Sequence, residues 1–307
     1  MNPVILITGP TASGKSALAL RLAEWLDGEI VSADSMQIYR GMDIGTAKAT
    51  PAERARVVHH LLDIREPGEP FSVVDYQREA SAAIRQIQTR GKTAVLCGGT
   101  GQYLSALTDG LTFASAGADP AVRAELEQLA ARDGSEALWQ KLAALDPASA
   151  GRIQPGDKKR LVRALEVSVL TGRPMSEHLA RSRDRAPEFA FNSFCLNHDR
   201  PELYRRIDQR VRDMVERGLV EEVRALLARP LPAGSTCLQA IGYKELAETI
   251  AGSQPLSEAV ARIQQATRRY AKRQLTWFRK MKGLIWLENM GADDAICHIK
   301  SVMNENK

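Results

Sequence analysis

The feature that most constrains this 307-residue chain is the stretch GPTASGKS at residues 9–16. It matches the pattern G-x-x-x-x-G-K-[ST], follows a β-branched run typical of a buried strand, and precedes apolar residues at helical spacing. In that context the glycines let backbone N–H groups converge on phosphate oxygens, and the helix N-terminus adds favourable partial charge. We therefore expect a P-loop whose ligand carries phosphate groups, although the loop alone does not say which ligand.

Every residue of this loop is a candidate for phosphate binding. Lys15 is expected to neutralise the anion, and the Ser16 hydroxyl can hold Mg²⁺. The predicted phosphate-binding set is Gly9, Pro10, Thr11, Ala12, Ser13, Gly14, Lys15 and Ser16.

Further short apolar runs predict a sheet around this loop. Strand-like segments occur at residues 29–35, 58–64 and 93–101, and a helical pattern that stops at Gly91 lies between the last two. Strands that alternate with helices indicate a parallel sheet covered on both faces. We expect an α/β fold, in which a P-loop parallel sheet is flanked by helices.

The alternation stops in the middle of the chain. From there the patterns are helical: Asp119 and Pro120 are typical of a helix start, and Gly172 is typical of a helix end. The tail after Gly291 gives no prediction. We expect a core of residues 1–113, an all-helical insertion of residues 114–190, and the second part of the core, mostly helical, at residues 191–307.

Two polar residues lie at the carboxyl ends of predicted strands, where ligands of parallel sheets bind. Asp34 can hold Mg²⁺, bind a substrate hydroxyl or take a proton; the alternative is a helix N-cap. Thr100 lies between glycines, where backbone or hydroxyl can approach a ligand closely; the alternative is a plain turn.

Basic residues gather in two segments. Lys158, Lys159 and Arg160 lie in the predicted insertion, and residues 265–283 contain several Lys and Arg and no acid. In the second segment, the pairs Arg268/Lys272 and Arg269/Arg273 are four apart, so like charges share a helix face and repel. An anionic partner would explain them; the alternative is a solvated basic face.

Arg206 and Arg210 are also four apart on a predicted amphipathic helix. Guanidinium groups suit bidentate phosphate contacts, so either could act as a second phosphate clamp. The ordinary alternative is a surface arginine paired with an acid.

Composition sets weaker limits. The net charge of +5 is compatible with an anionic partner, and the four cysteines lie too far apart to predict a disulfide framework or a zinc site. No apolar run approaches the ~18 residues of a membrane span. We expect a cytoplasmic protein.

Several motifs together resemble one family, the tRNA dimethylallyltransferases, also called tRNA isopentenyltransferases. The resemblance covers about residues 4–288. The motifs that carry it are GPTASGKS, SADSMQIYRGMDIGTAK, HHLLDI, GGTGQYL, RLVRALEV, RIDQRV, QAIGYKE and AKRQLTWFR. Gln102 and residues 154–157 depart from the usual pattern, which leaves their RNA contacts open.

The resemblance implies a chemistry. The P-loop would grip the pyrophosphate of dimethylallyl diphosphate, and the acceptor would be the N6 amine of the adenosine just 3′ of the tRNA anticodon. Asp34 would be the general base, Thr100 would help to orient the amine, and Arg210 would join Lys15 and Ser16 in binding the diphosphate, with Mg²⁺.

The resemblance also implies a tRNA-binding surface. To this surface we add the basic helix, by which we mean the predicted helix within residues 265–283. The anticodon stem-loop is the expected partner, and we expect the protein to act as a monomer. The predicted tRNA-binding residues are Asp34, Ser35, Met36, Gln37, Thr100, Arg123, Lys158, Lys159, Arg160, Leu161, Val162, Gln239, Ala240, Ile241, Gly242, Tyr243, Lys244, Arg268, Arg269, Lys272 and Arg273.

Three alternatives share the P-loop. A small-molecule or nucleotide kinase would use Asp34 to activate a hydroxyl, but the chain offers no convincing arginine-bearing lid. A non-catalytic RNA-binding protein driven by nucleotide would give no covalent product. An adenylate prenyltransferase would have no use for an RNA-binding insertion.

Overall fold

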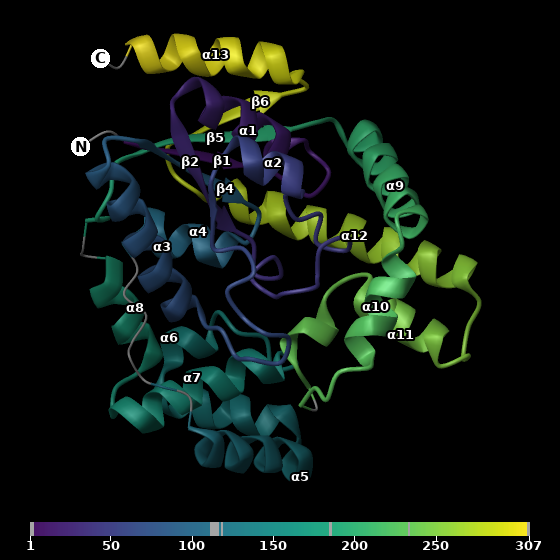
Figure 1. The fold of residues 1–307 in the computed structure, drawn as a ribbon. Helices are drawn as coiled ribbons and strands as arrows, with labels where there is room; N and C mark the ends of the chain where they lie inside the picture. Colours follow the sequence, from purple (N-terminus) through teal and green to yellow (C-terminus); the bar gives the residue numbers. More distant parts are fainter. Residues whose placement is uncertain (1–2, 111–116, 118, 184–185, 233, 306–307) are drawn as a thin grey trace. The chain divides into compact units, whose positions relative to one another are not determined.

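The computed structural model describes residues 3–110, 117, 119–183, 186–232 and 234–305. The chain divides into two compact units, drawn in Figure 1: unit 1 comprises Met1–Ser105 and Phe189–Lys307, and unit 2 comprises Ala106–Glu188. The predicted boundary between residues 113 and 114 lies outside the described residues.

Unit 1 is built on a six-stranded sheet in the order β3-β2-β4-β1-β5-β6, and every neighbouring pair of strands is parallel. The predicted α/β fold is therefore confirmed. The third strand is shorter than the sequence suggests, because only two residues of the segment 58–64 pair with a neighbour. The strands are β1 (Val4–Thr8), β2 (Gly28–Ala33), β3 (His59–His60), β4 (Thr93–Gly98), β5 (Phe191–Asn197) and β6 (Leu284–Glu288).

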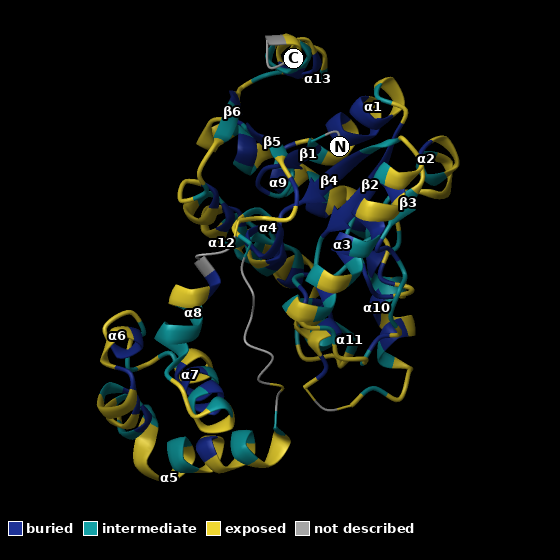
Figure 2. Ribbon diagram, turned by 90° about the vertical axis from the view of Figure 1, so that its left-hand side faces the viewer, coloured by how far each residue is buried: buried dark blue, intermediate teal, exposed yellow. Residues whose placement is uncertain are grey.

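Burial explains why these runs form strands. All residues of β1 and β2 are buried, and Figure 2 draws the central strands in dark blue under helices whose outer surfaces are exposed. Strands covered on both faces read as continuous apolar runs rather than as alternating ones. The helices of unit 1 are α1 (Lys15–Trp25), α2 (Pro51–Arg56), α3 (Val73–Thr89), α4 (Gly101–Thr108, which continues into unit 2), α9 (Arg200–Glu216), α10 (Leu219–Leu227), the 3₁₀ turn η1 (Thr236–Gln239), α11 (Tyr243–Ile250), α12 (Leu256–Phe278) and α13 (Ala292–Glu305).

A second apolar cluster of unit 1 lies away from the sheet. It packs the segment after β2, including Tyr39 and Met42, against Leu219 of α10, Tyr243 of α11 and Ile263 of α12. These helices come from the C-terminal third of the sequence, so the cluster places late helices beside an early loop.

The secondary-structure elements in the described part of unit 2 are all helices, and the unit has its own apolar core, to which Leu138, Leu142 and Leu165 belong. The predicted helix start is present, since Asp119 accepts hydrogen bonds from the first-turn N–H groups, and so is the stop at Gly172, which adopts φ 67°. The helices are α5 (Pro120–Leu145), α6 (Pro147–Ala150), α7 (Lys158–Thr171) and α8 (Met175–Arg183). No helix of the described chain is long and apolar enough to cross a membrane.

Candidate active site

The P-loop connects β1 directly to α1. Gly9 has φ 152° and Gly14 has φ 94°, conformations that side chains rarely adopt. At Gly9 a Cβ atom would also lie 2.3 Å from the carbonyl oxygen of Leu196. Thr8 fixes the end of β1, because its hydroxyl donates to the carbonyl of Gly98, 2.9 Å away. The glycines of the motif are thus required by this backbone path.

The loop opens into a cavity of about 350 Å³ at the carboxyl ends of the strands. All of its lining belongs to unit 1. The polar part of the lining includes Thr11, Lys15, Ser16, Asp34, Ser35, Gln37, Arg210, Gln239, Thr267, Tyr270, Arg273 and Gln274. The apolar part includes Leu20, Ile30, Met36, Val211, Met214, Leu219, Ala240, Ile241 and Ile263.

Two of the cations that line this cavity, Lys15 and Arg210, are half-buried. Burial lowers the pKa of Lys15, and the Arg210 guanidinium lowers it further. Burial also lowers the pKa of Arg210, against the effect of the Asp34 carboxylate. Two half-buried cations that destabilise each other favour an anionic ligand between them, because such a ligand relieves both costs.

Arg206, the other candidate for the second phosphate clamp, is paired with an acid. Its Nε donates to the Glu202 carboxylate at 2.8 Å, so it is the acid-paired arginine of the two. Of these two arginines, Arg210 lines the cavity and Arg206 does not. The structure thus separates two residues that helical spacing alone left equivalent.

Asp34 follows the last residue of β2 and lines the cavity. Its Oδ1 accepts hydrogen bonds from the backbone N–H groups of Met36, at 2.9 Å, and Gln37, at 3.3 Å. The helix N-cap that the sequence left open is not present, because no helix follows Asp34; the carboxylate caps a turn instead. In the described part of the chain Oδ2 accepts no hydrogen bond, so this second oxygen is available to a ligand.

Thr100 is tied to the same segment. Its Oγ1 accepts a hydrogen bond from the N–H of Ser35 at 3.1 Å, and its own N–H donates to the carbonyl of Ala33. The approach is close, since a Cβ atom at Gly98 would lie 2.2 Å from that carbonyl oxygen. The ends of β2 and β4 thus bring Asp34 and Thr100 together.

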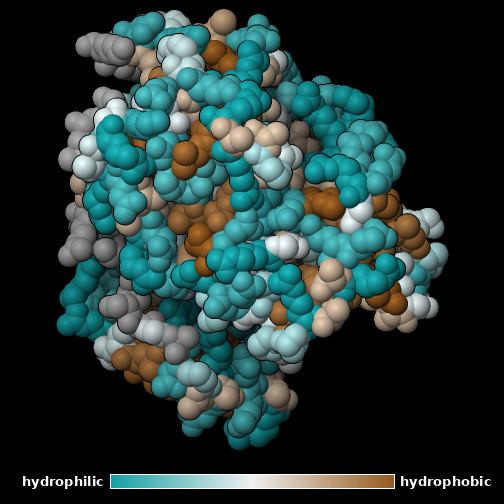
Figure 3. Space-filling view, viewed as in Figure 1, coloured by the Kyte–Doolittle hydropathy of each residue, from teal (hydrophilic) through white to brown (hydrophobic). Residues whose placement is uncertain are grey.

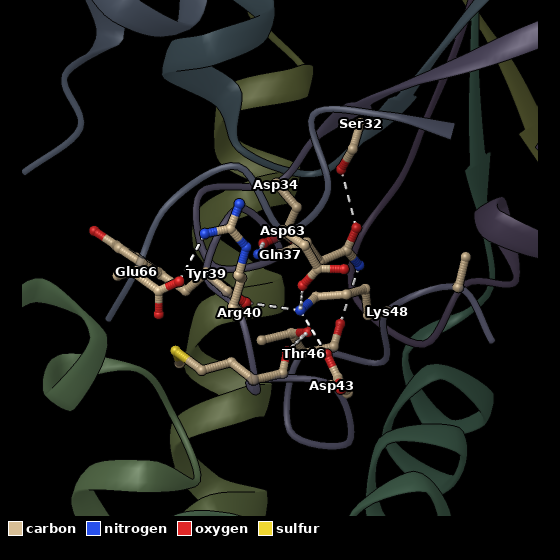
Figure 4. A network of polar contacts seen from close by, with 12 residues as sticks. Ser32, Asp34, Gln37, Tyr39, Arg40, Asp43, Thr46, Lys48, Asp63 and Glu66 are labelled. Atoms are coloured by element: carbon tan, nitrogen blue, oxygen red, sulfur yellow. Dashed lines mark hydrogen bonds and ion pairs between the residues drawn. The ribbon is translucent and has the colours of Figure 1, made fainter. Parts of the chain in front are cut away.

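A buried lysine holds the loop that follows Asp34. The side chain of Lys48 is 1% exposed, and its Nζ donates to the carbonyl of Tyr39 and to the carboxylates of Asp43 and Asp63 at 2.6–2.7 Å (Figure 4). Gln37 fastens the same loop, because it accepts from the Ser32 hydroxyl and donates to backbone carbonyls of residues 46 and 47. The cavity wall made by residues 34–37 is therefore fixed from within the loop.

Glu222 of α10 fixes this loop from outside. Its carboxylate accepts three successive backbone N–H groups, those of Asp43, Ile44 and Gly45, at 2.8, 2.8 and 3.0 Å. It also accepts the hydroxyl of Tyr243. Sequence reasoning missed this residue, since an acid in an amphipathic helix is usually solvated.

The predicted tRNA-binding residues of unit 1 are only partly accessible. Residues 239–243 line the cavity, whereas Lys244 is exposed. On α12, Arg269, Lys272 and Arg273 are exposed. Arg268 differs from them, because it is ion-paired with Asp208 and stacks on Tyr204. The face shown in Figure 3 is mostly hydrophilic, with apolar patches near its middle.

The predicted tRNA-binding residues of unit 2 include both exposed and buried side chains. Lys158, Lys159 and Arg160 are exposed at the start of α7. Leu161 and Val162 are buried in the core of the unit, so their side chains are not available to RNA. Arg123 donates to Glu166, a fully buried carboxylate that Arg163 also contacts.

The side chains of the site limit how a metal ion could bind. Among the described residues no group of three or more His, Cys, Asp or Glu could hold a metal ion. The exposed Ser16 hydroxyl lines the cavity beside Lys15. A Mg²⁺ ion that keeps several waters and binds mainly to ligand phosphates needs few protein oxygens, so this site fits such an ion and no protein-only cage.

Comparison with known proteins places the chain. A family model described as IPP transferase matches residues 37–281. The tRNA dimethylallyltransferase of Geobacter metallireducens is 50% identical over 293 residues, which cover 95% of this chain and 94% of that protein. The corresponding enzyme of Geobacillus thermodenitrificans is 49% identical over 93% of this chain and 90% of its own length.

This chain belongs to the IPP transferase family.

Solved structures agree with that membership. The tRNA isopentenylpyrophosphate transferase of Bacillus halodurans superposes with a TM-score of 0.73 at 39% identity, covering 99% of this chain and 96% of that one. A eukaryotic dimethylallyltransferase, described as acting on tRNA, has a TM-score of 0.86 at 28% identity, covering all of this chain and 80% of that one. The resemblance carried by the sequence motifs is therefore confirmed.

Proposed function

We propose that this protein is a prenyltransferase that moves a dimethylallyl group from dimethylallyl diphosphate to N6 of the adenosine 3′-adjacent to the tRNA anticodon. One observation carries the proposal: Lys15, Arg210 and Asp34 converge in one cavity, in a chain about half identical to proteins named for this activity. The cavity therefore combines an anion-binding side with a carboxylate.

The donor side of the site is cationic. The diphosphate lies against the P-loop, where backbone N–H groups, Lys15 and Arg210 bind its oxygens. The neighbouring apolar lining, which includes Val211, Met214 and Ile263, accommodates a prenyl chain. When bound, Mg²⁺ held by Ser16 and the diphosphate would add charge neutralisation there.

The reaction is a displacement at the allylic carbon. The N6 nitrogen forms a bond to C1, the bond between C1 and the bridging oxygen breaks, and the electron pair leaves with diphosphate. Lys15 and Arg210 stabilise the charge that develops on the leaving group, where electrostatic catalysis gains most. The N6 proton goes to Oδ2 of Asp34, while the Thr100 hydroxyl helps to orient the amine.

The adenosine that accepts the prenyl group must enter the cavity. A base of a single-stranded loop can be unstacked at lower cost than a paired one, which favours the anticodon loop as substrate. We assign RNA contacts to residues 34–37 and 239–244, to the exposed cations of α12, and to the start of α7 in unit 2. We propose a monomer that acts in the cytoplasm, where tRNA is modified.

The decisive experiment is mass spectrometry of tRNA nucleosides after incubation with dimethylallyl diphosphate. We expect a dimethylallyl adduct on the adenosine next to the anticodon. Lys15→Ala should give none, because it removes the central phosphate-binding cation. ATP is the control donor and should be neither consumed nor hydrolysed. Robust ATP hydrolysis stimulated by tRNA, without an adduct, would contradict the proposal.

A further inference from the structure

Gln274 is a buried side chain on the otherwise basic helix α12. It is 5% exposed, whereas the neighbouring Lys272 and Arg273 are exposed. Both ends of its amide are used: Oε1 accepts the backbone N–H of Thr11 at 2.8 Å, and Nε2 donates to the carbonyl of Gly99 at 2.9 Å. A buried amide with both ends satisfied is fixed in one orientation.

The two partners of Gln274 lie on opposite sides of the proposed reaction. Thr11 belongs to the P-loop after β1, and Gly99 immediately precedes Thr100 after β4. Thr100 in turn accepts the N–H of Ser35, the residue next to Asp34. A path that alternates hydrogen bonds with backbone links therefore runs from the diphosphate-binding loop through Gln274, Gly99–Thr100 and Ser35 to Asp34.

The amide lies close to the backbone of Gly99. A Cβ atom at Gly99 would lie 2.3 Å from Nε2 of Gln274. The residue must also accept at one end and donate at the other, because its partners are an N–H group and a carbonyl. Glutamate could not donate to Gly99, and methionine could do neither.

We propose that Gln274 is a positioning residue that sets the distance between the diphosphate-binding loop and the Asp34–Thr100 pair. The proposal rests on the proposed function. Transfer requires the allylic carbon and N6 to be held about 3–3.5 Å apart, and a misplacement of about 1 Å can cost ~10²-fold in rate. Gln274 touches neither reacting atom and acts through the two loops that hold them.

The test compares Gln274→Met with Gln265→Met, an exposed glutamine on the same helix. At saturation with both substrates, we expect the single-turnover rate of Gln274→Met to fall by about 10²-fold. Its affinity for tRNA should not change, because the cations of α12 remain. Gln274→Glu should be at least as slow, since its carboxylate faces the Gly99 carbonyl. Gln265→Met should behave as wild type.

Hydrogen exchange supplies a readout that does not depend on catalysis. The Thr11 amide should exchange slowly in the wild type and faster in both Gln274 variants, while peptides from α13 are unchanged. A wild-type Thr11 amide that exchanges freely would overturn the proposal even if neither variant folds. So would a Gln274→Met enzyme with the wild-type rate, or one that loses rate, tRNA affinity and thermal stability together. If the wild type gives no adduct but Thr11 is protected through Gln274, the proposed function fails and the positioning role stands.

Discussion

Asp34 combines two tasks that the sequence presents as alternatives. Oδ1 caps the turn formed by residues 34–37; the side chain lines the cavity, and Oδ2 accepts no hydrogen bond among the described residues. The turn fixes the carboxylate, so capping serves the proposed base by holding its other oxygen in place. The same side chain thus has both a structural and a chemical function.

Asp34→Asn separates these tasks. Asparagine keeps the cap, because its side-chain oxygen accepts the same N–H groups, but it cannot take the N6 proton. We expect the single-turnover rate to fall by ~10²–10⁴-fold, the usual cost of losing a general base. Affinities for tRNA and diphosphate and the midpoint of thermal unfolding should change little. A rate close to that of wild type would mean that Asp34 is a cap only.

Single residues of the site were predictable when the signal was local. The P-loop, Asp34 and Thr100 each follow a strand in a pattern of adjacent residues, so their place in the sheet could be inferred. Gln274 and Glu222 could not be inferred, because their partners are 263 and 177–179 positions away in the sequence. Helical spacing places Gln274 on the buried face of α12 with Ala271 and Phe278, but it does not say which backbone groups the amide meets.

At the scale of elements, α10 is attached to the loop after β2 by one carboxylate. Glu222 accepts three backbone N–H groups of that loop and the Tyr243 hydroxyl of α11. Since the loop begins at Asp34 and Tyr243 lines the same cavity, this carboxylate holds two proposed RNA-contact segments together. A glutamine amide in place of this carboxylate would direct its own N–H₂ group at backbone N–H groups of the loop.

We therefore expect Glu222→Gln to destabilise the protein by about 1–3 kcal/mol, the cost of leaving such donors unpaired. Its affinity for tRNA should also fall. The matched control is Glu221→Gln on the same helix, whose ion pair with Arg224 is exposed and contributes little. Chemical denaturation and filter binding measure the two effects. If both variants behave alike, Glu222 does not hold the loop.

The basic helix α12 gives the second prediction at this scale. The structure removes Arg268 from the set of available cations, because Asp208 pairs with it, and leaves Arg269 and Lys272 exposed. Arg269→Gln combined with Lys272→Gln should weaken tRNA binding and reduce the salt slope by ~0.7–0.9 for each RNA phosphate that the protein no longer neutralises. Pyrophosphate binding should persist.

The control removes the same charge elsewhere in unit 1. Arg78→Gln with Lys92→Gln changes α3 and the residue before β4, at the amino end of that strand. Its tRNA affinity should match wild type at every salt concentration. An unchanged salt slope in the α12 variant would mean that this face is only solvated.

At the scale of the whole molecule, the fold class followed from the sequence and the strand order did not. Alternating strands and helices predict a parallel sheet, but β1 lies between β4 and β5, and β5 comes after the helical middle of the chain. The order depends on long-range packing. The same limit applies to function, because the cavity takes its lining from β2, α9, α11 and α12 at once.

The two units should respond differently to the two substrates. Pyrophosphate binds the cavity, whose lining lies wholly in unit 1, so it should protect from hydrogen exchange only peptides of that unit, such as residues 9–16. An anticodon stem-loop should protect residues 34–37 and, in addition, the exposed start of α7 around Lys158 and Lys159 in unit 2.

Mass-detected hydrogen exchange with each ligand alone makes this comparison, and an unrelated RNA hairpin of equal length is the control. Non-specific binding is largely electrostatic and weakens as the salt concentration rises. The protection by the anticodon stem-loop should therefore persist at a salt concentration that removes the protection by the control hairpin. Glu166 fixes Arg123 and Arg163 within unit 2, so a stem-loop that engages this unit should also slow exchange in α7 beyond its first turn. A footprint confined to unit 1 would show that unit 2 does not bind the anticodon stem-loop.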